Sequence, residues 1–342
     1  MKHITQEDIA RRLGVTRITV SKALRDHPDI SAHMKKQVRE AADELGYSPN
    51  EIARQLTSRQ TKSIGVIVPD LENSFFSHVV NSIVDEASGS GYQILLTVSR
   101  ESEELEHRNL LNLLGKRVDG LLVCLSQHTT DRKVFQRIRK MEIPLLFFDR
   151  AFNDLGFSSV VFDDEAGMQR CVDRLVDLGY RRMGHLAGFT HTSVGRERLE
   201  GFRKALVHNQ LDLKEEWILE NGFEVSDGYY SFKKLMASGP MPEVIITVND
   251  RVAYGAMKAM AEEGISVPGQ MGLVGFGFHD SATYPCFPLS MVIQDPRLMG
   301  REATRRLIAE INGTPPAAPV SLRLETDLLF QNTTKTNLMS DL

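Results

Sequence analysis

From residue 62 onward, short apolar runs alternate with amphipathic segments, and this alternation restricts the fold more than any other feature of the sequence. Apolar runs at 64–68 and 120–125 are each followed by a segment whose apolar residues recur with helical spacing. Strands that alternate with helices in this way form parallel sheets that helices cover on both faces. Because the series starts again near residue 160, we expect two α/β lobes, each with about five or six strands.

The first part of the chain has a different pattern, set by residues that begin and end helices. Thr5 and Thr16 are placed to cap two short helices, and Gly14 can end the first of them in a left-handed conformation. Ser31 can cap a longer helix that Gly46 ends. Residues 1–49 are therefore expected to form an all-α headpiece.

The second predicted helix has the pattern of a recognition helix. With the first helix it would form a small core of Ile9, Leu13, Val15, Val20 and Leu24. The outer face near its start would then hold Arg17, Ile18, Ser21 and Lys22. From such positions in a helix-turn-helix, Arg and Lys can donate to guanine and Ile can touch a thymine methyl group in the major groove. The alternative that the spacing leaves open is a solvated helical pair with a few surface cations.

Charge is divided unevenly along the chain. Residues 1–62 contain 12 Lys or Arg and 8 Asp or Glu, whereas the remaining residues contain 29 and 37, which together give the net charge of −4. A basic headpiece on an acidic body can approach phosphates with one end only. An excess of this size also arises by chance, so it supports DNA binding only together with the helix pattern.

The sequence lacks the features of a secreted or membrane protein. It has no run of about eighteen apolar residues, and its acidic N-terminal segment has no apolar stretch of the kind found in secretory signals. Cys124, Cys171 and Cys286 are widely separated and form no CxxC pair, so we expect reduced thiols packed as small hydrophobic groups. The expected compartment is the cytoplasm, with no membrane partner.

Familiar catalytic and metal-binding motifs are missing from the sequence. There is no GxxxxGK loop followed by Ser or Thr, no HExxH, and no metal-ligand spacing among the histidines and cysteines. The glycines at 89 and 91 end a helix, and those at 275 and 277 lack the third glycine of a dinucleotide fingerprint. We therefore expect no catalytic residue, no metal site and no cofactor.

Short motifs along nearly the whole chain point to one family. They include ITQEDIA at 4–10, LGVT at 13–16, TVSKAL at 19–24, GYSPN at 46–50, ARQL at 53–56, IGVIVPD at 64–70, KRVDGLL at 116–122, FDR at 148–150, LGYRR at 178–182, RLEGF at 198–202, ND at 249–250 and VP at 267–268. In this order they closely resemble the lactose/galactose repressor (LacI/GalR) family. The resemblance implies a sequence-specific DNA-binding transcriptional regulator, a repressor, with a helix-turn-helix headpiece and a two-lobed body like periplasmic binding proteins.

The resemblance also implies the division of the chain. It places the headpiece at 1–49, a hinge helix and linker at 50–61, the body at 62–335, the first lobe at about 62–160 and 293–320, the second lobe at about 161–292 and 321–332, and a polar tail at 336–342. The tail has no sustained heptad, so a homodimer is expected and no tetramerising coiled coil is evident. Two headpieces related by a two-fold axis imply a pseudo-palindromic double-stranded operator.

The resemblance of the headpiece to this family also implies which residues contact DNA. Arg17, Ile18 and Lys22 should set the operator sequence, whereas Thr5, Thr16, Thr19, Ser21, Ser31 and Asn50 are candidates for phosphate contacts, which fix register. Ala53 and Leu56 lie in the expected hinge helix, which is too short to be stable alone and should order on DNA. Leu56 would then insert between bases through the minor groove; a core contact with the body is its alternative.

The effector of this family binds between the lobes, and the matching positions are Asn73, Phe75, Asp149, Arg198, Phe223, Asn249 and Gln294. For each of these residues a purely structural role is the alternative. Where the family usually has an Asp after the Gly-Phe pair, this chain has Gly277, so Phe278 or Asp280 would take over the contact, or the ligand differs. A sugar or related metabolite is expected on family frequency, and the direction of its effect on DNA binding stays open. A ligand-binding module whose headpiece recognises no specific site is the second hypothesis for the chain.

Overall fold

The computed structural model describes residues 4–47, 60–278, 288–314, 316 and 318–335. The chain divides into two compact units, residues 1–61 and residues 62–342. The predicted hinge helix and the polar tail at 336–342 lie outside the described residues. No helix of the described ranges is long and apolar enough to cross a membrane.

The described part of the first unit contains three short helices: α1 (Gln6–Leu13), α2 (Arg17–Leu24) and α3 (Ala32–Leu45). Thr5 begins α1 with a capping box, in which Asp8 accepts a hydrogen bond from the Thr5 amide. The turn into α2 requires Gly14, whose φ of 66° is unfavourable for residues with a side chain. The predicted small core is present, since Ile9 and Val20 are fully buried between the helices.

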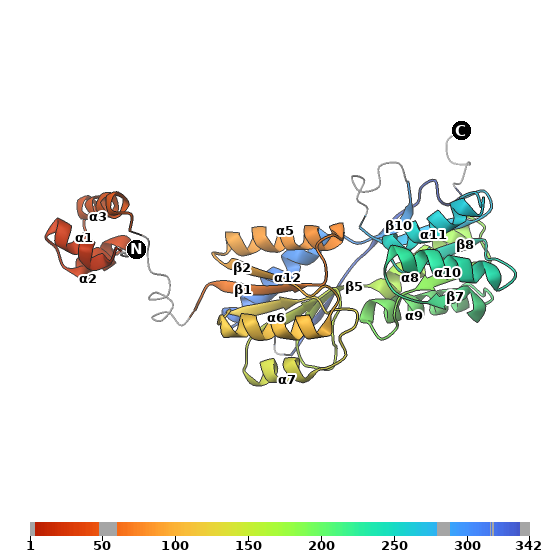
Figure 1. The fold of residues 1–342 in the computed structure, drawn as a ribbon, viewed down its shortest axis with the longest axis horizontal. Helices are drawn as coiled ribbons and strands as arrows, with labels where there is room; N and C mark the ends of the chain where they lie inside the picture. Colours follow the sequence, from red (N-terminus) through yellow and green to blue (C-terminus); the bar gives the residue numbers. More distant parts are fainter. Residues whose placement is uncertain (1–3, 48–59, 279–287, 315, 317, 336–342) are drawn as a thin grey trace. The chain divides into compact units, whose positions relative to one another are not determined.

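The first lobe has one sheet of six parallel strands in the order β11-β5-β4-β3-β1-β2. Its strands are β1 (Ser63–Val68), β2 (Gln93–Val98), β3 (Gly120–Val123), β4 (Leu145–Phe148), β5 (Ser158–Phe162) and β11 (Ser321–Leu324). Its helices are α5 (Ser74–Gly89), α6 (Glu103–Gly115), α7 (Lys133–Lys140) and α12 (Pro296–Ile311). Helices α5 and α12 cover one face, and α6 and α7 cover the other (Figure 1).

The second lobe repeats this plan, with the strand order β12-β10-β9-β8-β6-β7. Its strands are β6 (Met183–Ala187), β7 (Ile218–Glu220), β8 (Val244–Thr247), β9 (Gly272–Gly277), β10 (Ser290–Ile293) and β12 (Asp327–Leu329), of which β12 pairs antiparallel to β10. Its helices are α8 (Asp164–Asp177), α9 (Ser193–His208), α10 (Val225–Ala237), α11 (Asp250–Glu262) and the short η1 (Glu215–Trp217). Helices α8 and α9 pack on one face of the sheet, and α10 and α11 on the other.

The apolar runs of the sequence form strands that are buried on both faces. In β1, Ile64 and Val66 pack in the core beneath α5 and α12, whereas Ile67 packs in the core beneath α6 and α7. Cys124 and Cys171 are free and buried, as predicted, and each belongs to the core of one lobe. The expected two-lobed α/β architecture with parallel sheets is confirmed, with six strands in each lobe.

One predicted boundary is wrong. Residues 321–324 were expected in the second lobe, but β11 pairs in parallel with β5 of the first lobe, with Leu322 opposite Val160. Leu324 is buried in the first core and so fixes the strand there. The chain therefore crosses between the lobes after Phe162, after Ile293 and after Leu324, which places the lobe interface at three connecting segments.

Candidate functional site

The outer face of α2 has the exposure that a recognition helix needs. Val20 and Ala23 are fully buried and hold α2 on its neighbours. Arg17 and Ile18, in the first turn of α2, are exposed, with Ile18 70% exposed. An exposed cation and an exposed apolar side chain next to each other give this face groups that can contact a base edge and a thymine methyl group.

Lys22 and Ser21 are held by neighbours within the headpiece. Lys22 Nζ donates to Asp29 Oδ2 at 2.8 Å, and this contact lowers the pKa of the Asp29 carboxyl. The Arg25 guanidinium donates to the Ser21 carbonyl and hydroxyl oxygens, both at 3.2 Å. The Lys22 ammonium would have to exchange Asp29 for a base or a phosphate when DNA binds.

The other predicted DNA contacts form three groups in the structure. Thr5, Thr16 and Ser31 are the N-caps of the three helices, so their hydroxyls accept hydrogen bonds from backbone amides. Thr19 shares a hydrogen bond of 2.9 Å with Thr16. Asn50, Ala53 and Leu56 lie outside the described residues. Helix N-termini and the hydroxyl groups at them are suited to bind phosphates. The phosphate contacts expected of Thr5, Thr16 and Ser31 therefore stay a prediction.

In the body, Asp164, Arg198 and Gln294 form what we call the buried ion-pair cluster. Arg198 donates to both Asp164 oxygens, at 3.1 and 3.2 Å, and Gln294 Nε2 donates to Asp164 Oδ1 at 2.9 Å. The guanidinium also donates to the Val248 carbonyl and lies 4.0 Å over the Phe276 ring. Arg198 and Gln294 were predicted as effector contacts, and the structure brings them together on a carboxylate that the sequence did not single out.

Burial dominates the electrostatics of this cluster. It raises the pKa of Asp164 to about 6, because the loss of hydration outweighs the attraction of Arg198. A ligand that approaches Arg198 would therefore compete with an internal carboxylate for the same donors.

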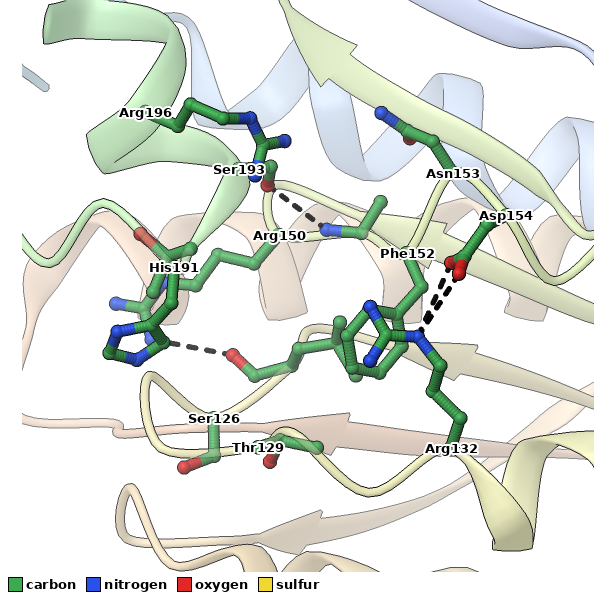
Figure 2. A pocket seen from close by; sticks show the side chains of 13 residues that line it. Ser126, Thr129, Arg132, Arg150, Phe152, Asn153, Asp154, His191, Ser193 and Arg196 are labelled. Carbon is green, nitrogen blue, oxygen red and sulfur yellow. Dashed lines mark hydrogen bonds and ion pairs between the residues drawn. The ribbon is translucent and has the colours of Figure 1, made fainter.

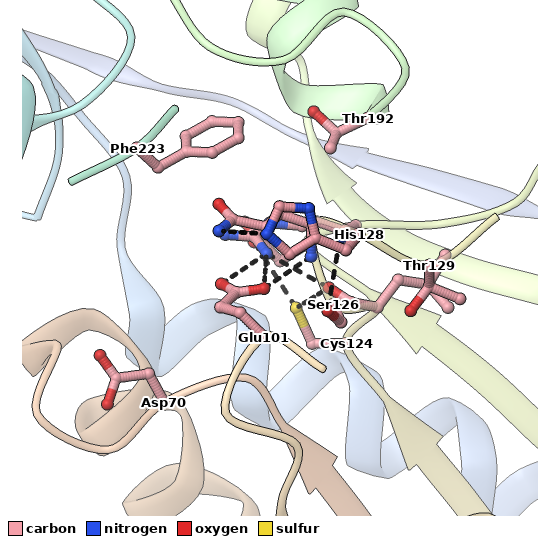
Figure 3. A network of polar contacts seen from close by, with 12 residues as sticks. Asp70, Glu101, Cys124, Ser126, His128, Thr129, Thr192 and Phe223 are labelled. Carbon is pink, nitrogen blue, oxygen red and sulfur yellow. Dashed lines mark hydrogen bonds and ion pairs between the residues drawn. The ribbon is translucent and has the colours of Figure 1, made fainter. Parts of the chain in front are cut away.

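Asp149 belongs to a second network at the end of β4. Burial raises its pKa; the Cys124 Sγ lies 3.7 Å away, and Arg150 Nε lies 3.9 Å away. Arg150 is held in turn by Glu101, with Nη1 2.9 and 3.0 Å from the two carboxylate oxygens. Glu101 and Cys124 are labelled in this polar network in Figure 3. Asp149 and Glu101 have φ of 60° and 55°, conformations that non-glycine residues adopt at a cost and that concentrate at binding sites.

Several predicted effector residues have structural partners. Asn73 caps α5 by accepting from the amide of Phe75, and Phe75 is buried in the first core. Asn249 caps α11 and donates to the Phe223 carbonyl at 2.9 Å, so both ends of its amide are engaged. These three residues have the structural roles named as alternatives.

The aromatic candidates lie between the lobes. Phe223 is buried, with its ring 5.1 Å from the Arg150 guanidinium. The Phe278 ring lies against His78 of the first lobe in a tilted arrangement, with a centroid distance of 4.7 Å. Gly277 has φ of 134°, which an Asp at this position would adopt only with strain, and Asp280 lies outside the described residues.

A pocket of about 280 Å³ lies between the lobes (Figure 2), and we call it the interlobe pocket. It is lined by Leu125, Ser126, Thr129, Arg132, Arg150, Ala151, Phe152, Asn153, Asp154, His191, Thr192, Ser193 and Arg196. These residues come from the loops after β3, β4 and β6 and from the start of α9. Ligands of parallel α/β sheets bind in such crevices, at the carboxyl ends of the strands.

None of the predicted effector residues that the structure describes lines the interlobe pocket. Asp149 and Asp164 instead line a smaller cavity of about 10 Å³, with room for about one water molecule. The pocket residues that sequence reasoning missed lie next to those it found: Arg150 follows Asp149, and Arg196 lies two positions before Arg198. The charge of Arg150 and its place just after β4 were signals that could have identified it, whereas the sequence offers only the charge of Arg196.

Polar contacts join the lobes around the pocket. The His191 Nε2 lies 2.6 Å from the Gln127 carbonyl oxygen, and the Ala151 amide donates to Ser193 Oγ at 3.3 Å. On β11, Arg323 pairs with Glu197 of α9 at 2.9 Å. A ligand in the pocket would lie among these contacts and could change the angle between the lobes.

Glu106 on α6 holds the loop that forms the floor of the pocket. Its side chain is fully buried and accepts from the Ser126 amide at 2.6 Å and from Thr129 Oγ1 at 3.1 Å. Burial raises the pKa of Glu106 to about 8. The folded protein therefore binds a proton here that the unfolded chain, near its ordinary value of 4.5, releases.

This difference predicts a pH-dependent stability. Because the folded pKa of Glu106 is raised, the free energy of unfolding should fall as pH rises from about 5 to 8, by about 2 kcal/mol between pH 6 and 8 from this group alone. Glu106→Gln cannot ionise and should lose that part of the fall, as measured by denaturant unfolding followed by circular dichroism. Glu104→Gln, on an exposed neighbour of the same helix, is the control. Equal pH slopes for Glu106→Gln and the parent chain would contradict the assignment.

Comparison with known proteins agrees with this architecture. Residues 5–50 match the family described as bacterial regulatory proteins, lacI family. Residues 61–327, more than half of the chain, match the family described as periplasmic binding proteins and sugar binding domain of LacI family. The chain belongs to the LacI family of bacterial regulatory proteins.

Individual relatives of this LacI-family chain extend over most of its length. The HTH-type transcriptional repressor PurR of Haemophilus influenzae (strain PittEE) is 30% identical over 309 residues, which cover 90% of this chain and 91% of that protein. The lac repressor dimer bound to operator and the anti-inducer ONPF is 28% identical, with a TM-score of 0.86 over 98% of this chain and 100% of that one. The CelR–cellobiose complex is 28% identical, with a TM-score of 0.73 over 97% and 100%.

Proposed function

We propose that this LacI-family regulator is a repressor that binds a pseudo-palindromic operator as a homodimer and responds to a small molecule bound between its lobes. The observation that carries the proposal is the exposed surface at the start of α2, where Arg17 and Ile18 are exposed while Val20 of the same helix is fully buried. The related lac repressor dimer is bound to operator, and CelR is bound to cellobiose, a carbohydrate. A carbohydrate-related effector is the corresponding expectation for this chain.

The proposed activity is binding rather than catalysis. The relatives are named transcriptional repressors, and their similarity covers both the headpiece and the body. Operator DNA lies in the cytoplasm of bacteria, so the proposal places the protein there.

Selection from a pool of random duplexes tests the proposal. The full chain should enrich one sequence composed of two inverted half-sites, because two-fold related headpieces each read the same bases. Enrichment of no sequence would reject the repressor and favour the second hypothesis, a ligand-binding module with a non-specific headpiece.

Substitution of the recognition face should change sequence preference. Arg17→Ala should weaken discrimination at one base pair of the half-site by about 1–3 kcal/mol, because a bidentate contact to guanine is lost. The measurement is the affinity for the selected duplex and its single-base variants. Lys36→Ala, at an exposed cation of α3, is the control and should leave the preference unchanged. Unchanged preference in Arg17→Ala would place the recognition surface elsewhere.

Exposed apolar side chains on both lobes support the homodimer. On the first lobe, Val84 of α5 is 40% exposed, and Leu96 of the edge strand β2 is 37% exposed. On the second lobe, Tyr230 of α10 and Tyr254 of α11 are exposed on two helices that pack together. An edge strand with exposed apolar residues is a liability in a monomer, and a second copy of the chain would cover it.

The proposed mechanism is linkage between two binding sites. A ligand that prefers one angle between the lobes shifts the population toward it, and the shift changes how two headpieces of a dimer are spaced for the half-sites. By reciprocity, operator binding changes the affinity for the ligand by the same factor.

A further inference from the structure

The charges that line the interlobe pocket are not balanced. Arg150 is paired with Glu101, and Arg132 is paired with Asp154 at 3.2 Å (Figure 2). The Arg196 side chain, by contrast, has no hydrogen bond or ion pair with any residue that the structure describes. The pocket therefore contains one guanidinium with no carboxylate to neutralise it.

The position of Arg196 suits an anion. It lies in the first turn of α9, a 16-residue helix with no acidic residue in that turn, so the helix dipole adds to its positive potential. Its acidic neighbour, Glu197, is engaged by Arg323 of the first lobe. Arg196 and Arg132 lie at opposite sides of the pocket in Figure 2. An oxyanion beside Arg196 would gain charge-assisted hydrogen bonds, which are about twice as strong as neutral ones.

The remainder of the lining suits hydroxyl groups. Asn153 lines the pocket and makes no hydrogen bond through its side chain with the described residues. Ser126, the α9 N-cap Thr192 and Ser193 at the start of α9 supply further polar atoms. A volume of about 280 Å³ is at the lower end of ligand pockets, which corresponds to a metabolite of monosaccharide size.

From these observations we propose that the effector is a small hydroxylated acid, whose carboxylate or phosphate group is bound by Arg196 and whose hydroxyl groups face Asn153. The inference rests on the proposed function, in which a small molecule binds between the lobes. It narrows that function from a carbohydrate-related molecule to an anionic one. The buried ion-pair cluster does not supply this charge, since Asp164 already neutralises Arg198.

The test compares acids with their neutral parents on the full chain. D-glucose is compared with D-gluconate and D-glucose 6-phosphate, and D-ribose with D-ribonate and D-ribose 5-phosphate, each by thermal shift and then by calorimetry. At least one acid should raise the melting temperature and bind at least tenfold more tightly than its neutral parent, and the responding acid tells carboxylate from phosphate. A response to the neutral parents that equals the response to the acids, or no response to any acid, overturns the proposal.

Two variants in helix α9 test whether the anion binds at Arg196. Arg196→Gln removes a guanidinium that holds no described partner, so it should melt like the parent chain while raising the dissociation constant of the acid about 10- to 100-fold. Arg203→Gln removes an exposed arginine of the same helix, paired with Glu215, and should leave the dissociation constant unchanged. Equal affinities of Arg196→Gln and the parent for the acid would overturn the assignment. The same preparation is also used for the duplex selection. If it selects an inverted repeat but binds no acid, this inference fails while the proposed DNA binding stands.

Discussion

Asp164→Ala should lower the free energy of unfolding of the second lobe by about 3–5 kcal/mol, because removal of one partner leaves the other charge buried and uncompensated. Of its direct contacts with the described residues, Arg198 would keep those with the Val248 carbonyl and the Phe276 ring. Trp217, the only tryptophan of the chain, is buried in the same lobe, so its fluorescence reports the unfolding. The loss should appear as a lower denaturant midpoint with little change in slope.

A double-mutant cycle separates loss of the pair from loss of packing. Asp164→Ala combined with Arg198→Met removes both charges, so the double variant should be more stable than Asp164→Ala alone. Asp164→Asn keeps an acceptor for Gln294 and should fall between the parent chain and Asp164→Ala. A change within about 0.5 kcal/mol for Asp164→Ala, the size typical of a surface substitution, would show that the pair is hydrated in solution.

Leu96→Glu should convert the protein to a monomer and weaken operator binding by about 100- to 10,000-fold, since two linked headpieces gain that much from effective concentration. Leu96 lies on the edge strand β2, where a buried charge would be unpaired across the proposed interface. Sedimentation velocity gives the oligomeric state, and titration of the selected duplex gives the affinity.

The matched control is Val207→Glu. Val207 is 70% exposed on α9, which packs on α8 rather than on the surfaces assigned to the dimer. This variant should remain dimeric and bind DNA as the parent does. A dimeric Leu96→Glu with full affinity would move the interface away from β2.

Much of the fold could be predicted because each local signal agreed with the global pattern. Gly14, Thr5 and Thr16 mark helix ends that the structure has at those positions. The strand β11 was assigned to the wrong lobe because its sequence, Ser-Leu-Arg-Leu, alternates polar and apolar residues. That pattern fits the edge of either sheet, so only the pairing with β5 decides the lobe.

The binding site was less predictable than the fold. Asp164 was missed because an acidic residue at a helix start is explained equally well by capping, and its neighbour Asp163 is in fact the N-cap of α8. Its partner Arg198 is 34 positions away in the sequence. Arg196 was missed because neighbouring residues of one helix point in different directions, and sequence alone does not say which of them faces the pocket.

Sequence-specific DNA binding is the central property proposed for this protein, and the ratio of two affinities tests it directly. The full chain is titrated with its selected inverted-repeat duplex and with a shuffled duplex of equal length, across a range of salt concentrations. We expect both affinities to fall steeply with salt, while the selected duplex is bound about 1,000-fold or more tightly than the shuffled one. Equal affinities for the two duplexes at every salt concentration would contradict the account.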